Sequence, residues 1–107
     1  MNTARLNLLL KYLEEEPNDP FNLYAIATEY LSESIEKAKE YFDLLLNKYP
    51  EYLATYFHAA QLYVDIEQEE KAIEIYKAGI TLAKAQNNSK TLRELESAFQ
   101  NLLFEMD

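Results

Sequence analysis

The sequence contains nearly the same helical segment twice, 34 residues apart. EKAKEYFDLLLNKYP at 36–50 and EKAIEIYKAGITLAK at 70–84 both open with Glu-Lys-Ala and place an aromatic ring four residues after the alanine. The segments before them also correspond at an offset of 33 residues: Leu23, Ile26, Ala27 and Tyr30 match Tyr56, Ala59, Ala60 and Tyr63. A repeat of this length, built from two helices, predicts stacked hairpins that bury one continuous core.

The composition favours an all-α fold in a single domain spanning residues 1–107. The chain has one Gly and three Pro, too few for the turns of a β-sheet protein, and it is rich in helix-forming residues. Its length is near the commonest size of one domain. It contains no cysteine, which excludes a disulfide framework and thiolate metal sites.

Apolar residues at helical spacing predict about six helices joined by short connections. Three starts carry capping signals: Thr3 before the first helix, Asp19 followed by Pro20 before the second, and a capping box from Thr91 to Glu94 at the last. The expected segments are 4–16, a helix pair in 20–50, a second pair in 53–86 with its first helix starting near Leu53, and 89–106.

The paired segments resemble the tetratricopeptide repeat family. The pattern of a large residue, an apolar residue, a small residue and Tyr, followed by Ala and an aromatic ring, occurs in 20–50 and again in 53–86. The chain departs from the family pattern at Glu67, where an inter-helix glycine is usual, and at Lys84, where proline is usual. The resemblance implies a right-handed α-α superhelix in which 20–50 and 53–86 are repeats 1 and 2. The segment 4–16 would be a half repeat and 89–106 a capping helix.

The net charge of −9 bears on the choice of partner. A negative field repels nucleic acids and anionic membrane surfaces, and the basic residues are scattered singly among carboxylates. No apolar run reaches the roughly 18 residues of a membrane span. We therefore expect a cytoplasmic protein whose partner is a protein or peptide. The acidity is interpreted first as a source of solubility, and attraction of a basic partner is the alternative.

The sequence offers little for catalysis. His58 is the single histidine, and no second histidine, cysteine or activated nucleophile accompanies it in a recognisable motif. Gly-rich phosphate loops, zinc motifs and calcium loops are also missing from the sequence. We expect no enzyme activity, no cofactor and no metal site.

The aromatic residues point to a binding surface. Half of the Tyr and Phe residues fall on apolar stripes and are expected in the core: Tyr12, Tyr30, Phe42, Tyr56, Tyr63, Tyr76 and Phe99. Phe21, Tyr24 and Phe57 lie off those stripes. In the family that this chain resembles, the first helix of each repeat lines a concave groove, and Tyr24 and Phe57 would stand side by side there. The candidate groove residues are Phe21, Tyr24, Thr28, Leu31, Phe57, His58 and Gln61.

Two functions remain open from the sequence. The first is a protein-interaction module that holds a peptide or helical segment in this groove, unless a terminal helix covers the rings. The alternative is homodimerisation through an apolar face of the last helix, with Leu95, Leu102 and Leu103 presented outward.

Overall fold

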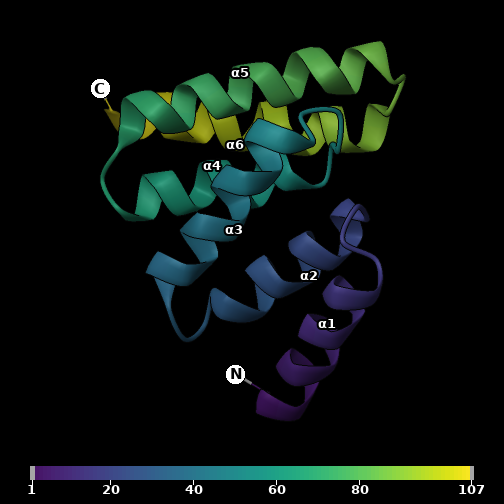
Figure 1. Cartoon of the computed structure of the whole chain (residues 1–107). Coiled ribbons are helices and arrows are strands. Elements are labelled where there is room, and N and C mark those ends of the chain that lie inside the picture. The colour runs from purple at the N-terminus through teal and green to yellow at the C-terminus, as the bar shows by residue number, and fades with distance from the viewer. Residues whose placement is uncertain (1, 107) are drawn as a thin grey trace. The chain divides into compact units, whose positions relative to one another are not determined.

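The computed structural model describes residues 2–106, and the regular secondary structure in that range is entirely helical (Figure 1). This confirms the expected all-α class. The helices are α1 (Thr3–Glu15), α2 (Pro20–Tyr30), α3 (Ile35–Lys48), α4 (Thr55–Asp65), α5 (Glu69–Ala85) and α6 (Ser89–Met106). The start of α4 lies about two residues later than expected, because Leu53 belongs to the turn before it.

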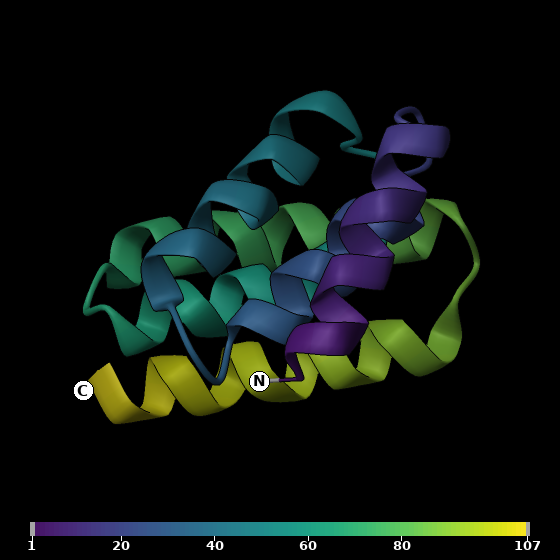
Figure 2. The same cartoon turned by 60° about the horizontal axis from the view of Figure 1, so that its bottom comes forward.

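The chain divides into two compact units, with the boundary between Thr55 and Tyr56 at the start of α4. Unit 1 contains α1, α2 and α3, and unit 2 contains α4, α5 and α6. In unit 1, α2 packs against both α1 and α3 (Figure 2). In unit 2, α5 and α6 lie side by side and run in opposite directions, as both views show.

Side-chain caps fix where the helices of unit 1 begin. The backbone N–H of Phe21 donates to the Asp19 carboxylate at 3.0 Å, and Pro20 occupies the first helical position, as predicted. At α3, Ser34 accepts from the backbone N–H of Lys37 at 3.2 Å. The prediction for α1 was wrong by one residue, because Asn2 and not Thr3 accepts the capping hydrogen bond.

The core of unit 1 joins its three helices. Leu6 and Leu9 of α1 pack with Ile26 of α2, and the rings of Tyr30 and Tyr41 stack at 5.9 Å between α2 and α3. Phe42 and Leu45 of α3 are fully buried. The prediction that Tyr12 lies in the core was wrong, because this residue of α1 is 44% exposed.

Two turns of unit 2 each contain one residue in the left-handed backbone conformation. Glu67 after α4 and Asn87 after α5 have φ values of 62° and 56°. At the first turn, the N–H of Gln68 donates to the carbonyl of Tyr63 at 2.9 Å and that of Glu67 to Val64 at 3.0 Å. This pair of bonds is the Schellman motif, and the same pattern recurs after α5. The chain thus reverses direction at both turns without the glycine that such turns favour.

The core of unit 2 is formed by residues of the repeat pattern seen in the sequence. Tyr56, Ala59, Ala60 and Tyr63 of α4 are buried, as are Ala72, Tyr76 and Gly79 of α5. Phe99 of α6 contacts Tyr76, with ring centroids 6.0 Å apart. The prediction for the start of α6 was wrong, because its first turn is capped by Asn88, which accepts from the N–H of Thr91 at 3.0 Å. Met106 at the end of α6 is exposed.

Candidate functional site

Four of the candidate residues belong to unit 1 and lie along or just after α2. Phe21 is 54% exposed, and Tyr24, Thr28 and Leu31 are half-buried. The ring of Tyr24 packs against that of Tyr52 in the segment before α4, with centroids 5.9 Å apart and planes tilted by 58°. This surface of α2 therefore presents one half-buried ring, Tyr24, and one exposed ring, Phe21.

The two tyrosines of this pair keep their protons at neutral pH. Burial raises the pKa of Tyr24, and burial together with the nearby Tyr24 and Asp19 raises that of Tyr52. Their phenols are therefore neutral hydrogen-bonding groups and not anions. A ligand on this surface meets apolar ring faces and hydroxyl groups.

The other three candidate residues belong to unit 2 and lie on α4. The rings of Phe57 and His58 meet edge to face, with centroids 5.7 Å apart. Burial lowers the pKa of His58, so the imidazole is neutral at pH 7. Gln61 is exposed, and its side-chain amide donates to Asp65 at 3.3 Å. The arrangement offers an apolar ring with polar groups further along the same helix.

Phe57 also lines a cavity of about 440 Å³ that the sequence analysis did not anticipate. The other lining residues come from α6, which was expected to act as a capping helix or a dimerisation face and not to line a site. The signal was present in the sequence as a second, more polar stripe on α6 at helical spacing, beside its leucine stripe. The lining residues of α6 are Arg93, Glu94, Ser97, Ala98 and Asn101.

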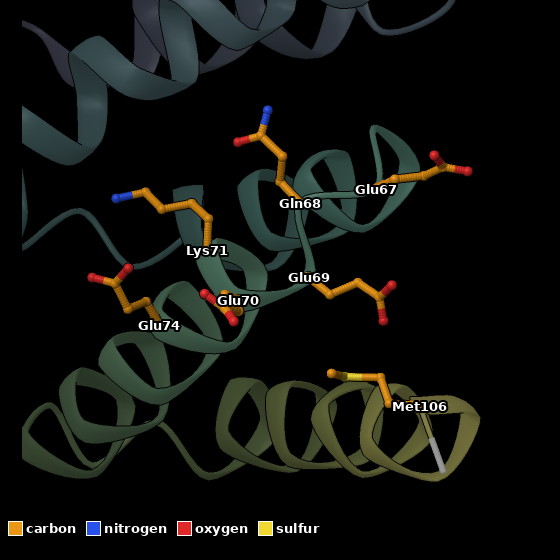
Figure 3. Close-up of a pocket in the computed structure, with 7 residues that line it drawn as sticks. All are labelled: Glu67, Gln68, Glu69, Glu70, Lys71, Glu74 and Met106. Carbon is orange, nitrogen blue, oxygen red and sulfur yellow. The ribbon is translucent and has the colours of Figure 1, made fainter.

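A separate acidic notch of about 650 Å³ lies where α4 turns into α5. Figure 3 shows Met106 of α6 directed toward the start of α5, where glutamates surround the opening. Negative charge in the first turn of a helix is favoured by the helix dipole, which accounts for Glu69 and Glu70. The lining residues are Glu67, Gln68, Glu69, Glu70, Lys71, Glu74 and Met106.

The described residues contain no group of three or more His, Cys, Asp or Glu side chains placed to hold a metal ion. Across residues 2–106, none of the helices combines the length and apolar character needed to span a bilayer.

Comparison with known proteins identifies relatives of this arrangement. A solution NMR structure of a tetratricopeptide repeat domain protein from Salinibacter ruber matches with a TM-score of 0.76 and 34% sequence identity, over 81% of this chain and 89% of that one. A crystal structure of a tetratricopeptide repeat domain protein from the same organism also matches with a TM-score of 0.76 and 34% identity, over 78% and 96% of the two chains. No protein-family model and no curated protein sequence matches this chain.

Proposed function

Because this chain belongs to the tetratricopeptide repeat family, we propose that it is a non-enzymatic module that binds a peptide or helical segment of a partner protein. The residues that take part in binding under this proposal come from both units, along or just after α2 in unit 1 and on α4 in unit 2. These are Phe21, Tyr24, Thr28, Leu31, Phe57, His58 and Gln61.

The cavity beside Phe57 is the observation that carries this proposal. It places one aromatic ring against a wall of α6 that offers a guanidinium, a carboxylate, a hydroxyl and an amide. Small, partly apolar hollows with a few polar groups are suited to one anchoring side chain of a peptide. The polar groups can pair with the peptide backbone beside that anchor.

The charge of the protein indicates the chemistry of the partner. A net charge of −9 attracts basic segments over a distance set by the ionic strength. We therefore expect the ligand to combine one or two apolar anchors with flanking Lys or Arg. High salt will slow its association more than it speeds its release.

Selection from a random peptide library displayed on phage tests the proposal without knowledge of the natural partner. The affinity of selected peptides is measured by fluorescence anisotropy for the wild type, for Phe57→Ala, and for Tyr24→Ala with Phe57→Ala. We expect the double variant to bind about tenfold or more weakly, because truncating an anchor contact costs at least about 1 kcal/mol.

Leu44→Ala is the matched control, because Leu44 is an exposed apolar residue of α3 outside the candidate surface. This variant should bind like the wild type, and circular dichroism should show equal helicity for all proteins. Equal affinity of the wild type and the double variant would contradict binding at these rings.

One exposed ring supports the alternative of self-association through α6. Leu95 and Leu102, expected on its outer face, are instead buried at 0% and 5% exposure. Phe104, however, is 84% exposed, and Leu103 nearby is 37% exposed. Self-association through α6 would therefore depend on Phe104. Light scattering at several concentrations tests it, because Phe104→Ala must then abolish a dimer that forms through α6.

A further inference from the structure

The outer face of α1 carries an apolar patch that its own hairpin leaves open. Leu6 and Leu9 point inward at 6% and 9% exposure. Leu8 and Tyr12 are 47% and 44% exposed. They are four positions apart in the sequence, so they are neighbours on one side of the helix. Together they form a small apolar centre on an exposed helix face.

Opposite charges flank this centre at equal distances. Arg5 precedes Leu8 by three residues, and Glu15 follows Tyr12 by three. The four positions share one face, because their spacing is that of successive helical turns. The Arg5 side chain remains 66% exposed although its Nε lies 3.6 Å from a carboxylate oxygen of Glu29. Glu15 is also exposed.

This order is symmetric about residue 10. Arg5 and Glu15 lie equally far from it on either side, as do Leu8 and Tyr12. When two copies of such a helix pack antiparallel about a two-fold axis, each residue faces its counterpart across the centre. Arg5 of one copy then faces Glu15 of the other, and Leu8 faces Tyr12, at both ends of the contact.

We propose that α1 is a self-association surface, and that two copies of this chain pair through antiparallel α1 helices in this register. The pairing joins an apolar centre to two opposite-charge contacts, and it also sets the two helix dipoles antiparallel. The four contact residues of α1 are not among the candidate groove residues, so the proposal uses a different set of side chains. The surface is distinct from the proposed groove and does not depend on it.

The short length of α1 limits the affinity of the proposed dimer. α1 has 13 residues, which is about 20 Å of helix. A single pair of such helices buries less than the roughly 1,200 Å² of a stable specific interface. We therefore expect a dissociation constant on the order of 0.1 mM, in the range of weak and transient complexes.

Sedimentation equilibrium from about 0.01 to about 1 mM protein tests the association. We expect a monomer–dimer equilibrium for the wild type and at least a tenfold higher dissociation constant for Leu8→Glu. Leu44→Glu is the matched control, because Leu44 of α3 is 43% exposed and Leu8 is 47% exposed. A wild type that stays monomeric throughout overturns the proposal, as does equal weakening by the control.

Charge reversal tests the register. Arg5→Glu and Glu15→Arg should each weaken the dimer, because each places like charges opposite one another at both ends. An equimolar mixture of the two variants should recover at least the wild-type affinity, because every end then pairs opposite charges. Circular dichroism checks that Arg5→Glu, which also places a carboxylate near Glu29, keeps its helicity.

Two further results would overturn the proposal. A dimer that survives Leu8→Glu but is lost in Phe104→Glu belongs to α6. A mixture of the two charge variants that associates no better than either alone shows that α1 does not pair in this register.

Discussion

Gly79 of α5 lies so close to Tyr56 of α4 that a Cβ atom added at Gly79 would stand 2.7 Å from the Tyr56 Cβ. The same added atom would lie 3.2 Å from a methyl carbon of Leu95 on α6. Gly79 is thus a point where the three helices of unit 2 approach closely. The Tyr56 Cβ is fixed to its backbone, so it cannot move aside without a shift of α4.

Gly79→Ala is expected to destabilise the protein. Alanine would normally favour a helix by about 1 kcal/mol over glycine. Here the steric overlap outweighs that gain, and we expect a net loss of about 1–3 kcal/mol in the free energy of unfolding. Urea denaturation followed by circular dichroism measures it. Ala78→Gly, at an exposed neighbouring position, should cost only the propensity difference. A stabilised Gly79→Ala variant would contradict the close packing.

Glu67→Gly is expected to stabilise the turn between α4 and α5. Glu67 has a φ of 62°, which costs a residue with a side chain about 1 kcal/mol or more relative to glycine. We expect thermal unfolding at a higher temperature. Asn87→Gly should gain less, because asparagine tolerates the left-handed region better. Glu74→Gly, at an exposed position in the interior of α5, is the control and should destabilise.

Asn22→Ala is expected to loosen the end of α1. The buried Asn22 amide of α2 donates to the carbonyls of Tyr12 and Glu16 at 3.4 and 3.5 Å. These bonds are long, so we expect a loss of about 1 kcal/mol in unfolding free energy. Hydrogen exchange should show that α1 opens faster in this variant than in the wild type, whereas the opening of α5 stays the same. Asn47→Ala, at an exposed position of α3, should leave both unchanged.

The stability of the protein should fall as the pH drops below the ordinary histidine range. Burial lowers the pKa of His58 from 6.5, so the unfolded chain takes up this proton at a higher pH than the folded chain. The unfolded state therefore binds more protons below about pH 6.5, and acid favours it. Above about pH 6.5, the stabilising contribution of the neutral His58 side chain is fully present.

Urea denaturation at about pH 8 and about pH 5.5 measures this effect, because most carboxylates stay ionised over that interval. His58→Gln should lose less stability than the wild type between the two values. An NMR titration of the His58 ring should show protonation below the ordinary pKa. A midpoint above 6.5 would contradict the burial of the ring.

The helices themselves could be predicted from the sequence because their determinants are local. Apolar residues at helical spacing, and the cap formed by Asp19 before Pro20, act within one or two turns of chain. The 34-residue period then limited the architecture, since a hairpin of this kind buries its apolar face only against another.

The faces of the terminal helices could not be predicted in the same way. On α1, the spacing of Tyr12 placed it on a buried stripe, yet it is exposed. On α6, Leu95 and Leu102 were expected to face outward in the dimerisation alternative, yet both are buried. Periodicity shows that a helix has an apolar side but not how wide the neighbouring helix makes the buried strip. That width depends on which side chains meet across the contact.

The sequence by itself determined an all-α chain of paired helices, because helix formation and the repeat pattern depend on residues close together in the chain. Only the tertiary structure decided that α6 supplies a polar wall to the cavity at Phe57, and that α1 leaves Leu8 and Tyr12 exposed. Packing between distant segments sets which side of each helix faces solvent, and no local pattern contains that information.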